Sequence, residues 1–172
     1  MELKLIKPTI KRSTFNLKGK TCNEIVDELN EKFPGHFTAH PKFDIKMNAS
    51  DKSVKSVTIS AEGSIKLPAW PKVKSMGENT QKEWKRFLSK LDKHEEGHRL
   101  ILLESMAIVA DEAQNWYDAK IEKGEVPDGY ELDKLYKEEW YGKYYDPPQD
   151  KYDTATENGK KEGAWFEASR CD

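Results

Sequence analysis

The stretch most able to do chemistry is residues 93–99, Lys-His-Glu-Glu-Gly-His-Arg, which contains the zinc-peptidase pattern H-E-x-x-H. On a helix, His94 and His98 lie one turn apart on one face, so both imidazoles can bind a single Zn²⁺. Glu95 lies beside them as a carboxylate that does not bind the metal. The pattern therefore predicts hydrolysis by a zinc-activated water, with Glu95 as the general base.

The surrounding residues indicate that the motif belongs to an amphipathic helix. Hydrophobic side chains recur every three or four residues on both sides of it, at Trp84, Phe87, Leu88, Leu91, Leu102, Val109, Ala113 and Trp116. His94, Glu95 and His98 fall on this hydrophobic stripe, whereas Lys85 and Lys90 fall on the other face. Because buried polar groups need partners, the pattern favours a metal site over two core histidines without a ligand.

This helix is predicted to be unusually long. Thr80 and Glu83 have the spacing of a capping box, which opens a helix. No proline follows until Pro127, so the pattern can run over residues 81–121, roughly 60 Å at 1.5 Å per residue. Gly97, between the two histidines, would let another part of the chain approach the metal face.

The residues before this helix predict a shorter helix and a small sheet. The first helix is expected over residues 21–33, where Thr21 begins a capping box and Pro34 ends the helix. Alternating hydrophobic residues predict strands at 13–17 and, as two or three antiparallel strands, within 43–67. The predicted fold class is α+β, with a small antiparallel sheet packed on the long helix that carries H-E-x-x-H.

Several segments outside these elements have weaker patterns. His36 and His40 lie among prolines and are interpreted as part of a polar loop, not as metal ligands. A short helix is plausible over 132–140, and residues 152–165, rich in turn-forming residues, are a candidate functional loop. A peptide substrate is expected to pair with a sheet edge at residues 60–67.

Length and composition limit the classes of protein. The 172 residues suit a single domain over residues 1–172. Acidic and basic residues are interspersed with a net charge of −2, which argues against a nucleic-acid or anionic-membrane surface. No apolar run is long enough for a membrane span, and the N-terminus lacks the pattern of a signal peptide. The expected partner is a peptide or protein substrate, and the oligomeric state is left open.

The two cysteines, Cys22 and Cys171, lie near opposite ends of the chain. They can close one long loop in an oxidising compartment or remain reduced and buried. The sequence leaves both alternatives open.

Catalytic zinc usually has three protein ligands, and the third is not obvious here. Glu104 points away from His98 on the helix, and Asp111 lies about 20 Å farther along it. The third ligand must therefore come from the chain after the helix. The candidates are Glu131, Asp133, Glu138, Glu139, Asp153, Glu157 and Asn158.

Motifs along most of the chain resemble a known bacterial family. They are Phe15, Leu17-Lys18-Gly19-Lys20-Thr21, Leu67-Pro68-Ala69-Trp70, Glu83-Trp84, Phe87, Leu91, His94-Glu95, Gly97-His98, Tyr152-Asp153, Thr156, Gly159 and Gly163-Ala164. In these residues the chain resembles domain-of-unknown-function family 922, which is regarded as a family of zinc-dependent peptidases. The resemblance implies a zincin-like α+β fold, a zinc cofactor and a secreted or periplasmic location.

The C-terminal motif departs from that family at two positions. Asn158 stands where the family has a His just before a Gly, and Glu162 stands where it has a Gln. If that His is the family's third ligand, this chain has lost it. If the ligand is the acidic residue of the Tyr-Asp pair, Asp153 preserves the site. Asp153 is the favoured ligand, with Glu157 and Glu138 as alternatives.

The function predicted from these residues is that of a zinc metallopeptidase. His94, His98 and Asp153 would hold Zn²⁺, and Glu95 would act as general base. Tyr152 would donate a hydrogen bond to the developing oxyanion. The alternative is a catalytically weak zincin-like binding module, in which Asn158 has replaced a metal ligand or a residue that hydrogen-bonds the transition state.

Overall fold

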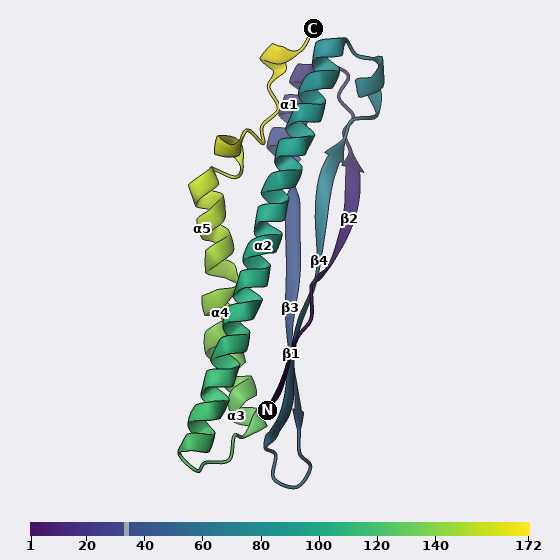
Figure 1. The fold of residues 1–172 in the computed structure, drawn as a ribbon. Coiled ribbons are helices and arrows are strands. Elements are labelled where there is room, and N and C mark those ends of the chain that lie inside the picture. The colour runs from purple at the N-terminus through teal and green to yellow at the C-terminus, as the bar shows by residue number, and fades with distance from the viewer. Residues whose placement is uncertain (33–34) are drawn as a thin grey trace. The chain divides into compact units, whose positions relative to one another are not determined.

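The computed structural model describes residues 1–32 and 35–172. Its fold is mixed α+β, with a four-stranded sheet and one long helix, α2 (Figure 1). The strands are β1 (Glu2–Leu5), β2 (Thr9–Asn16), β3 (His36–Met47) and β4 (Val54–Ala69). The α-helices are α1 (Cys22–Lys32), α2 (Glu78–Glu122), α3 (Gly129–Leu135), α4 (Tyr141–Tyr144) and α5 (Asp146–Thr156). A π-helical turn at Tyr136–Trp140 and 3₁₀ turns at Pro71–Ser75, Lys160–Glu162 and Ala168–Arg170 complete the described elements.

Helix α2 is a continuous helix of 45 residues, so the predicted long helix over 81–121 is confirmed. Its N-terminus differs from the prediction. The carboxylate of Asp172 caps it, accepting hydrogen bonds from the backbone of Thr80 at 3.2 Å and of Asn79 at 3.3 Å. A residue 92 positions away therefore satisfies the free N–H groups that the predicted capping box was expected to bind.

The other local predictions are partly right. Helix α1 is confirmed, and the hydroxyl of Thr21 accepts a hydrogen bond from the backbone of Glu24 at 3.3 Å. Its predicted end at residues 33–34 lies outside the described residues. The interpretation of His36 and His40 as a loop is wrong, because both lie in β3. The predicted functional loop begins inside α5, which runs to Thr156.

The sheet is partly parallel, which corrects the expected antiparallel sheet. Strand β1 pairs in parallel with β4, from Glu2 opposite Ser56 to Leu5 opposite Ile59. Strand β4 also pairs with β2 and β3 and lies between them (Figure 1). The predicted substrate edge at residues 60–67 is therefore wrong, because this part of β4 is interior to the sheet. Strand β1 alternates charged and hydrophobic residues over only four positions, and such a pattern does not give the direction of pairing, so the parallel pair was not foreseen.

The described chain forms two compact units. Unit 1 consists of Met1–Thr9, Ala39–Gly63 and Leu100–Lys151, and unit 2 of Ile10–Thr38, Ser64–Arg99 and Tyr152–Asp172. In unit 1, Phe43 of β3 stacks on Tyr136 with ring centroids 4.3 Å apart. The buried hydrophobic residues of unit 1 include Val57, Ile59, Leu102, Met106, Val109, Ala113, Leu132, Trp140 and Tyr145.

Unit 2 has a core rich in aromatic residues, and it contains every residue of the predicted motif. The core residues are Leu17, Cys22, Ile25, Leu29, Trp70, Trp84, Phe87, Leu91, Ala164 and Phe166. Trp70 donates its indole N–H to the carbonyl of Gly19 at 2.8 Å, which satisfies a buried polar group. Packing of the C-terminal residues Ala164 and Phe166 against α2 holds the end of the chain beside the motif helix.

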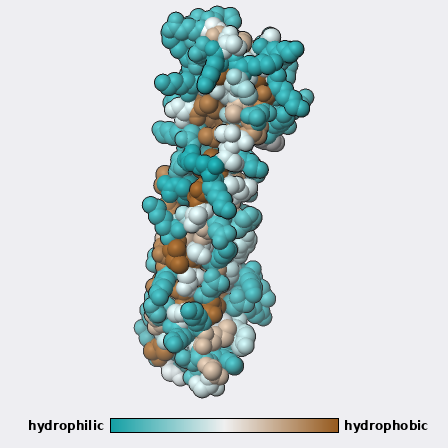
Figure 2. All heavy atoms as spheres, turned by 90° about the vertical axis from the view of Figure 1, so that its right-hand side faces the viewer, coloured by the Kyte–Doolittle hydropathy of each residue, from teal (hydrophilic) through white to brown (hydrophobic). Residues whose placement is uncertain are grey.

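The surface is mainly polar, as the mean hydropathy of −0.90 suggests. On the face drawn in Figure 2, hydrophobic side chains are interspersed with hydrophilic ones. None of the helices within the described residues has the length and hydrophobicity needed to cross a membrane.

A disulfide joins Cys22 to Cys171 and closes a loop with a sequence separation of 149. Of the two alternatives open to these cysteines, the structure has the oxidised pair. The bond ties the last residues of the chain to α1, within unit 2.

We expect removal of this disulfide to lower the free energy of unfolding by about 2–5 kcal/mol, because the cross-link restricts the unfolded chain. Denaturant unfolding of the wild type and of the Cys22→Ser/Cys171→Ser variant, followed by circular dichroism, measures the difference. Adding a reductant should shift the wild-type curve and leave the variant's curve in place. Equal unfolding free energies for the two proteins would contradict the prediction.

Candidate metal centre

Helix α2 presents the predicted motif residues toward the interior of unit 2. His94, Glu95 and His98 are 4%, 3% and 7% exposed. The two imidazole rings are nearly perpendicular, with centroids 4.9 Å apart. This follows from the helical period, which places positions i and i+4 on one face. Local geometry alone thus brings two buried nitrogen ligands together.

Asp153 reaches both histidines from α5. Its Oδ1 atom lies 3.0 Å from Nε2 of His98 and 3.4 Å from Nε2 of His94. One ligand atom from each of the three residues lies within 4.8 Å of the others. Within the described part of the chain, these residues form a group that could hold a metal ion.

Two of the distances in this group fit a tetrahedral ion. With metal–ligand bonds of about 2.0–2.1 Å, neighbouring ligand atoms of a tetrahedron lie about 3.3–3.4 Å apart. The two His–Asp distances, 3.0 and 3.4 Å, are close to this edge length. Two imidazoles and one carboxylate are a donor set found at catalytic zinc, and they also suit other first-row metals. The three residues therefore fit a divalent metal ion.

The other candidates for third ligand stay outside this group. Glu157 pairs with Lys161 at 3.1 Å, and Glu138 is 3.9 Å from Lys134. Asn158 is exposed in the turn after α5 and has a φ of 52°. Of the predicted candidates, the structure brings Asp153 to the histidines.

Tyr152, the neighbour of Asp153, packs tightly on α2. Its ring stacks on that of His94, with centroids 5.0 Å apart and an interplanar angle of 16°. Its hydroxyl donates to the carboxylate of Glu162 at 3.1 Å. A Cβ atom at Gly97 would overlap this hydroxyl and ring, so the glycine makes the close approach possible. Burial, followed by the hydrogen bond to Glu162, raises the pKa of Tyr152 and keeps the phenol protonated at neutral pH.

Glu162 belongs to the site although no role was predicted for it from the sequence. Its Oε2 atom lies 2.9 Å from Nδ1 of His94. A tight turn between Gly159, with φ 81°, and Gly163, with φ 79°, places the Glu162 side chain beside His94. Both glycines adopt the left-handed conformation that disfavours other residues. The one indication of this role in the sequence was that position 162 is acidic here, whereas the family has Gln at that position.

The Glu95 carboxylate is buried, with little access to water, beside the His-His-Asp group. Burial raises its pKa to about 7, and the negative charges of Asp153 and Asp92 add to the rise. Gly35 lies against the carboxylate, which a Cβ atom at that position would overlap. A cation held by the His-His-Asp group would favour the ionised form of Glu95.

Strand β3 begins beside the site. The ring of Phe37 stacks on that of His98, with centroids 5.8 Å apart and an interplanar angle of 10°. Among the described strands, β3 pairs with β4 alone. The other backbone edge of β3 therefore has no strand partner in the described part of the chain.

The chain is similar to a family of bacterial proteins. A model described as "Bacterial protein of unknown function (DUF922)" matches residues 12–123. The chain belongs to this family. The match covers the H-E-x-x-H motif and ends before Asp153 and Glu162. No curated protein and no solved structure matches the chain.

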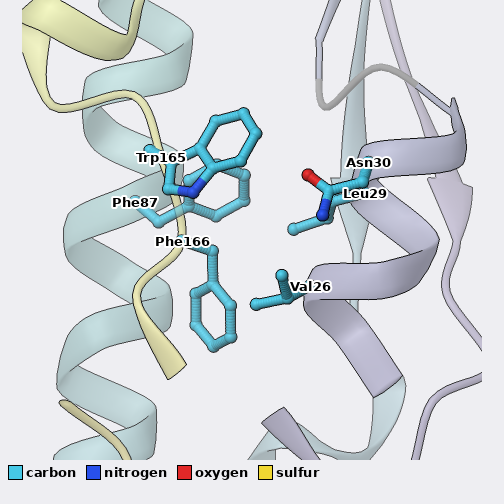
Figure 3. A pocket seen from close by; sticks show the side chains of 6 residues that line it. All are labelled: Val26, Leu29, Asn30, Phe87, Trp165 and Phe166. Carbon is cyan, nitrogen blue, oxygen red and sulfur yellow. The ribbon is translucent and has the colours of Figure 1, made fainter. Parts of the chain in front are cut away.

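This DUF922 protein also has a small hollow between α1, α2 and the C-terminal segment (Figure 3). Its volume is about 10 Å³, room for roughly one water molecule. The lining residues are Val26, Leu29, Asn30, Phe87, Trp165 and Phe166. Asn30 is the one polar residue of this lining, so the hollow offers no cluster of metal ligands or proton-transferring groups and is a packing feature of the core.

We expect Gly97→Ala in this DUF922 protein to weaken binding of a divalent metal ion, tested with Zn²⁺, at least tenfold. Alanine improves helix propensity by about 1 kcal/mol, but its methyl group displaces Tyr152 and with it the adjacent Asp153. Zinc affinity measured by competition with a chromophoric chelator checks this. Gly142→Ala is the matched control, since a Cβ atom at that helical glycine would meet nothing within 4 Å. Unchanged affinity in Gly97→Ala would show that Tyr152 can move without cost to the site.

Proposed function

We propose that this protein is a zinc-dependent metallopeptidase with a zincin-like fold, formed as one domain over residues 1–172. The observation that carries the proposal is the meeting of Asp153 of α5 with the buried His94 and His98 of α2, the helix that also bears Glu95. A purely structural zinc site has no need of a buried carboxylate that does not bind the metal. Glu95 therefore favours catalysis over a structural role.

Each residue of the site has a separate role in peptide hydrolysis. Zinc held by His94, His98 and Asp153 would act as a Lewis acid and lower the pKa of water to about 7. Glu95 accepts the proton of the attacking water on its carboxylate and later delivers it to the nitrogen of the leaving amine. Tyr152 donates its hydroxyl hydrogen to the developing oxyanion, an interaction worth about 3 kcal/mol. To do so, Tyr152 exchanges its hydrogen bond with Glu162 for one with the substrate.

The start of β3 is the best place for a peptide substrate. Its residues His36–Thr38 lie in unit 2, and Phe37 stacks on the ligand His98. An extended peptide can add to the unpaired edge of this strand through backbone hydrogen bonds, with alternate side chains giving specificity. This assignment replaces the edge that was expected on β4.

The alternative function, a zincin-like binding module with weak catalysis, has one observation in its favour. The hydroxyl of Tyr152 is already bound to Glu162, at 3.1 and 3.3 Å from its two oxygens. If that bond persists in the substrate complex, the oxyanion receives no hydrogen bond from Tyr152.

We also propose that the protein works in an oxidising compartment, secreted or periplasmic. The Cys22–Cys171 disulfide supports this location, since such bonds persist mainly outside the reducing cytosol.

Metal content and hydrolysis of casein test the proposal directly. We expect about one zinc ion per chain in protein purified without added metal, together with casein cleavage that a chelator abolishes. Zinc without cleavage would support the binding module. Absence of zinc, even after its addition, would refute the enzyme.

A further inference from the structure

We infer that Glu162 is a positioning residue of the metal centre, which holds His94 with its Nε2 atom free to bind the metal. The inference rests on the metal site of the proposed function, and not on its catalytic step. Oε2 of Glu162 is 2.9 Å from Nδ1 of His94, while Nε2 on the other side of the ring faces Asp153 at 3.4 Å. The imidazole thus lies between two carboxylates.

The competition between these carboxylates decides the tautomer of His94. A neutral imidazole carries one N–H, and an ionised carboxylate can only accept a hydrogen bond. The shorter contact, to Glu162, favours the proton on Nδ1 and leaves the lone pair of Nε2 directed toward Asp153 and the metal position. A carboxylate that accepts the second N–H of a ligating histidine also fixes the ring and raises its basicity.

Glu162 is itself held in place. Tyr152 donates its hydroxyl hydrogen to the same carboxylate, 3.1 Å from Oε2 and 3.3 Å from Oε1. The backbone of the turn packs on the ligand, since a Cβ atom at Gly159 would be 3.0 Å from Cγ of His94. The orientation of the carboxylate therefore does not depend on the hydrogen bond to His94 alone.

The segment after Glu162 is anchored to α2, the helix that carries His94. Arg86 donates to the carbonyl of Gly163 at 2.7 Å and to that of Trp165 at 2.6 Å. Its guanidinium also makes two hydrogen bonds, each of 2.7 Å, to Glu83, whose side chain is 2% exposed. Such bidentate, charge-assisted pairs are geometrically specific. Glu162 and His94 are thus fixed to one rigid element.

Two measurements on Glu162 variants test this role. Competition with a chromophoric chelator gives the zinc affinity, and ¹⁵N NMR of the imidazole rings at mildly alkaline pH gives the tautomer of His94 in zinc-free protein. We expect Glu162→Ala to weaken zinc binding about 10–100-fold and to lose the preference for Nδ1–H. Glu162→Gln keeps an accepting oxygen, so it should retain the tautomer and lose less affinity. Glu157→Ala, which removes an exposed acid nearby, should change neither quantity.

The tautomer separates this inference from the proposed function. A wild-type His94 protonated on Nε2 would overturn the inference, even if Glu162→Ala failed to fold. Wild-type affinity and tautomer in Glu162→Ala would overturn it as well. Failure of the wild type to bind zinc would refute the metallopeptidase, and the NMR measurement would still decide the role of Glu162.

Discussion

Replacing Glu95 with Gln should reduce peptide hydrolysis by about 10²–10⁴-fold while zinc remains bound. The amide has the size of the carboxylate but cannot accept the proton of the attacking water. Glu95 is 3% exposed, and burial already opposes its charge, as its pKa of about 7 indicates. A neutral amide therefore suits this position, and the fold and the metal ligands should persist. Casein cleavage and elemental zinc analysis of the same samples provide the measurement.

Glu96→Gln is the matched control for this variant. Glu96 is the next residue on α2, but it pairs with Arg99 at 2.5 Å and with Arg12, outside the metal group. Its loss should leave hydrolysis within about twofold of wild type, because surface ion pairs contribute little. If Glu95→Gln retained full activity with zinc bound, another group would have to be the base, and the proposed mechanism would fail.

Replacing Asp153 with Ala should weaken zinc binding by at least about 100-fold. This exceeds the loss of about 10–100-fold that is typical when a residue that only hydrogen-bonds a metal ligand is removed. Two imidazoles alone cannot fill the three protein positions of a catalytic zinc site. The side chain of Asp153 is 38% exposed, so its removal leaves no enclosed cavity in the core and the fold should persist. Equilibrium zinc titration of the folded variant measures the effect.

Glu157→Ala serves as the control here, since its side chain is exposed and bound to Lys161. It should bind zinc like the wild type. Wild-type affinity in Asp153→Ala would falsify Asp153 as the third ligand, and a loss of affinity in Glu157→Ala would transfer the role to Glu157.

Agreement between sequence and structure is best where interactions are local. The helical period alone placed His94 and His98 one turn apart on a buried face, and the uninterrupted pattern predicted α2 to within a few residues at each end. The cap of that helix was predicted less well. Thr80 was expected to open a capping box with Glu83, whereas Asp172 caps the helix and Glu83 binds Arg86. A capping-box pattern spans only four positions, so it cannot show that a residue at the far C-terminus, Asp172, will cap the helix.

The same limit explains the sheet. Strand β1 is short, and its pairing with residues 56–59 depends on the packing of segments more than fifty residues apart. Its parallel direction therefore could not be foreseen, nor could the interior position of β4.

The sequence by itself determined the family. It also determined the motif helix together with His94, Glu95 and His98, because a helical period relates residues that are a few positions apart. It narrowed the third ligand to seven residues. The tertiary structure alone brought Asp153 to His94 and His98, joined Cys22 to Cys171, and placed Glu162 on His94 across 68 residues of chain. These contacts depend on how the C-terminal segment packs on α2, through Gly97, Gly159 and Arg86, and no periodicity in the sequence encodes that packing.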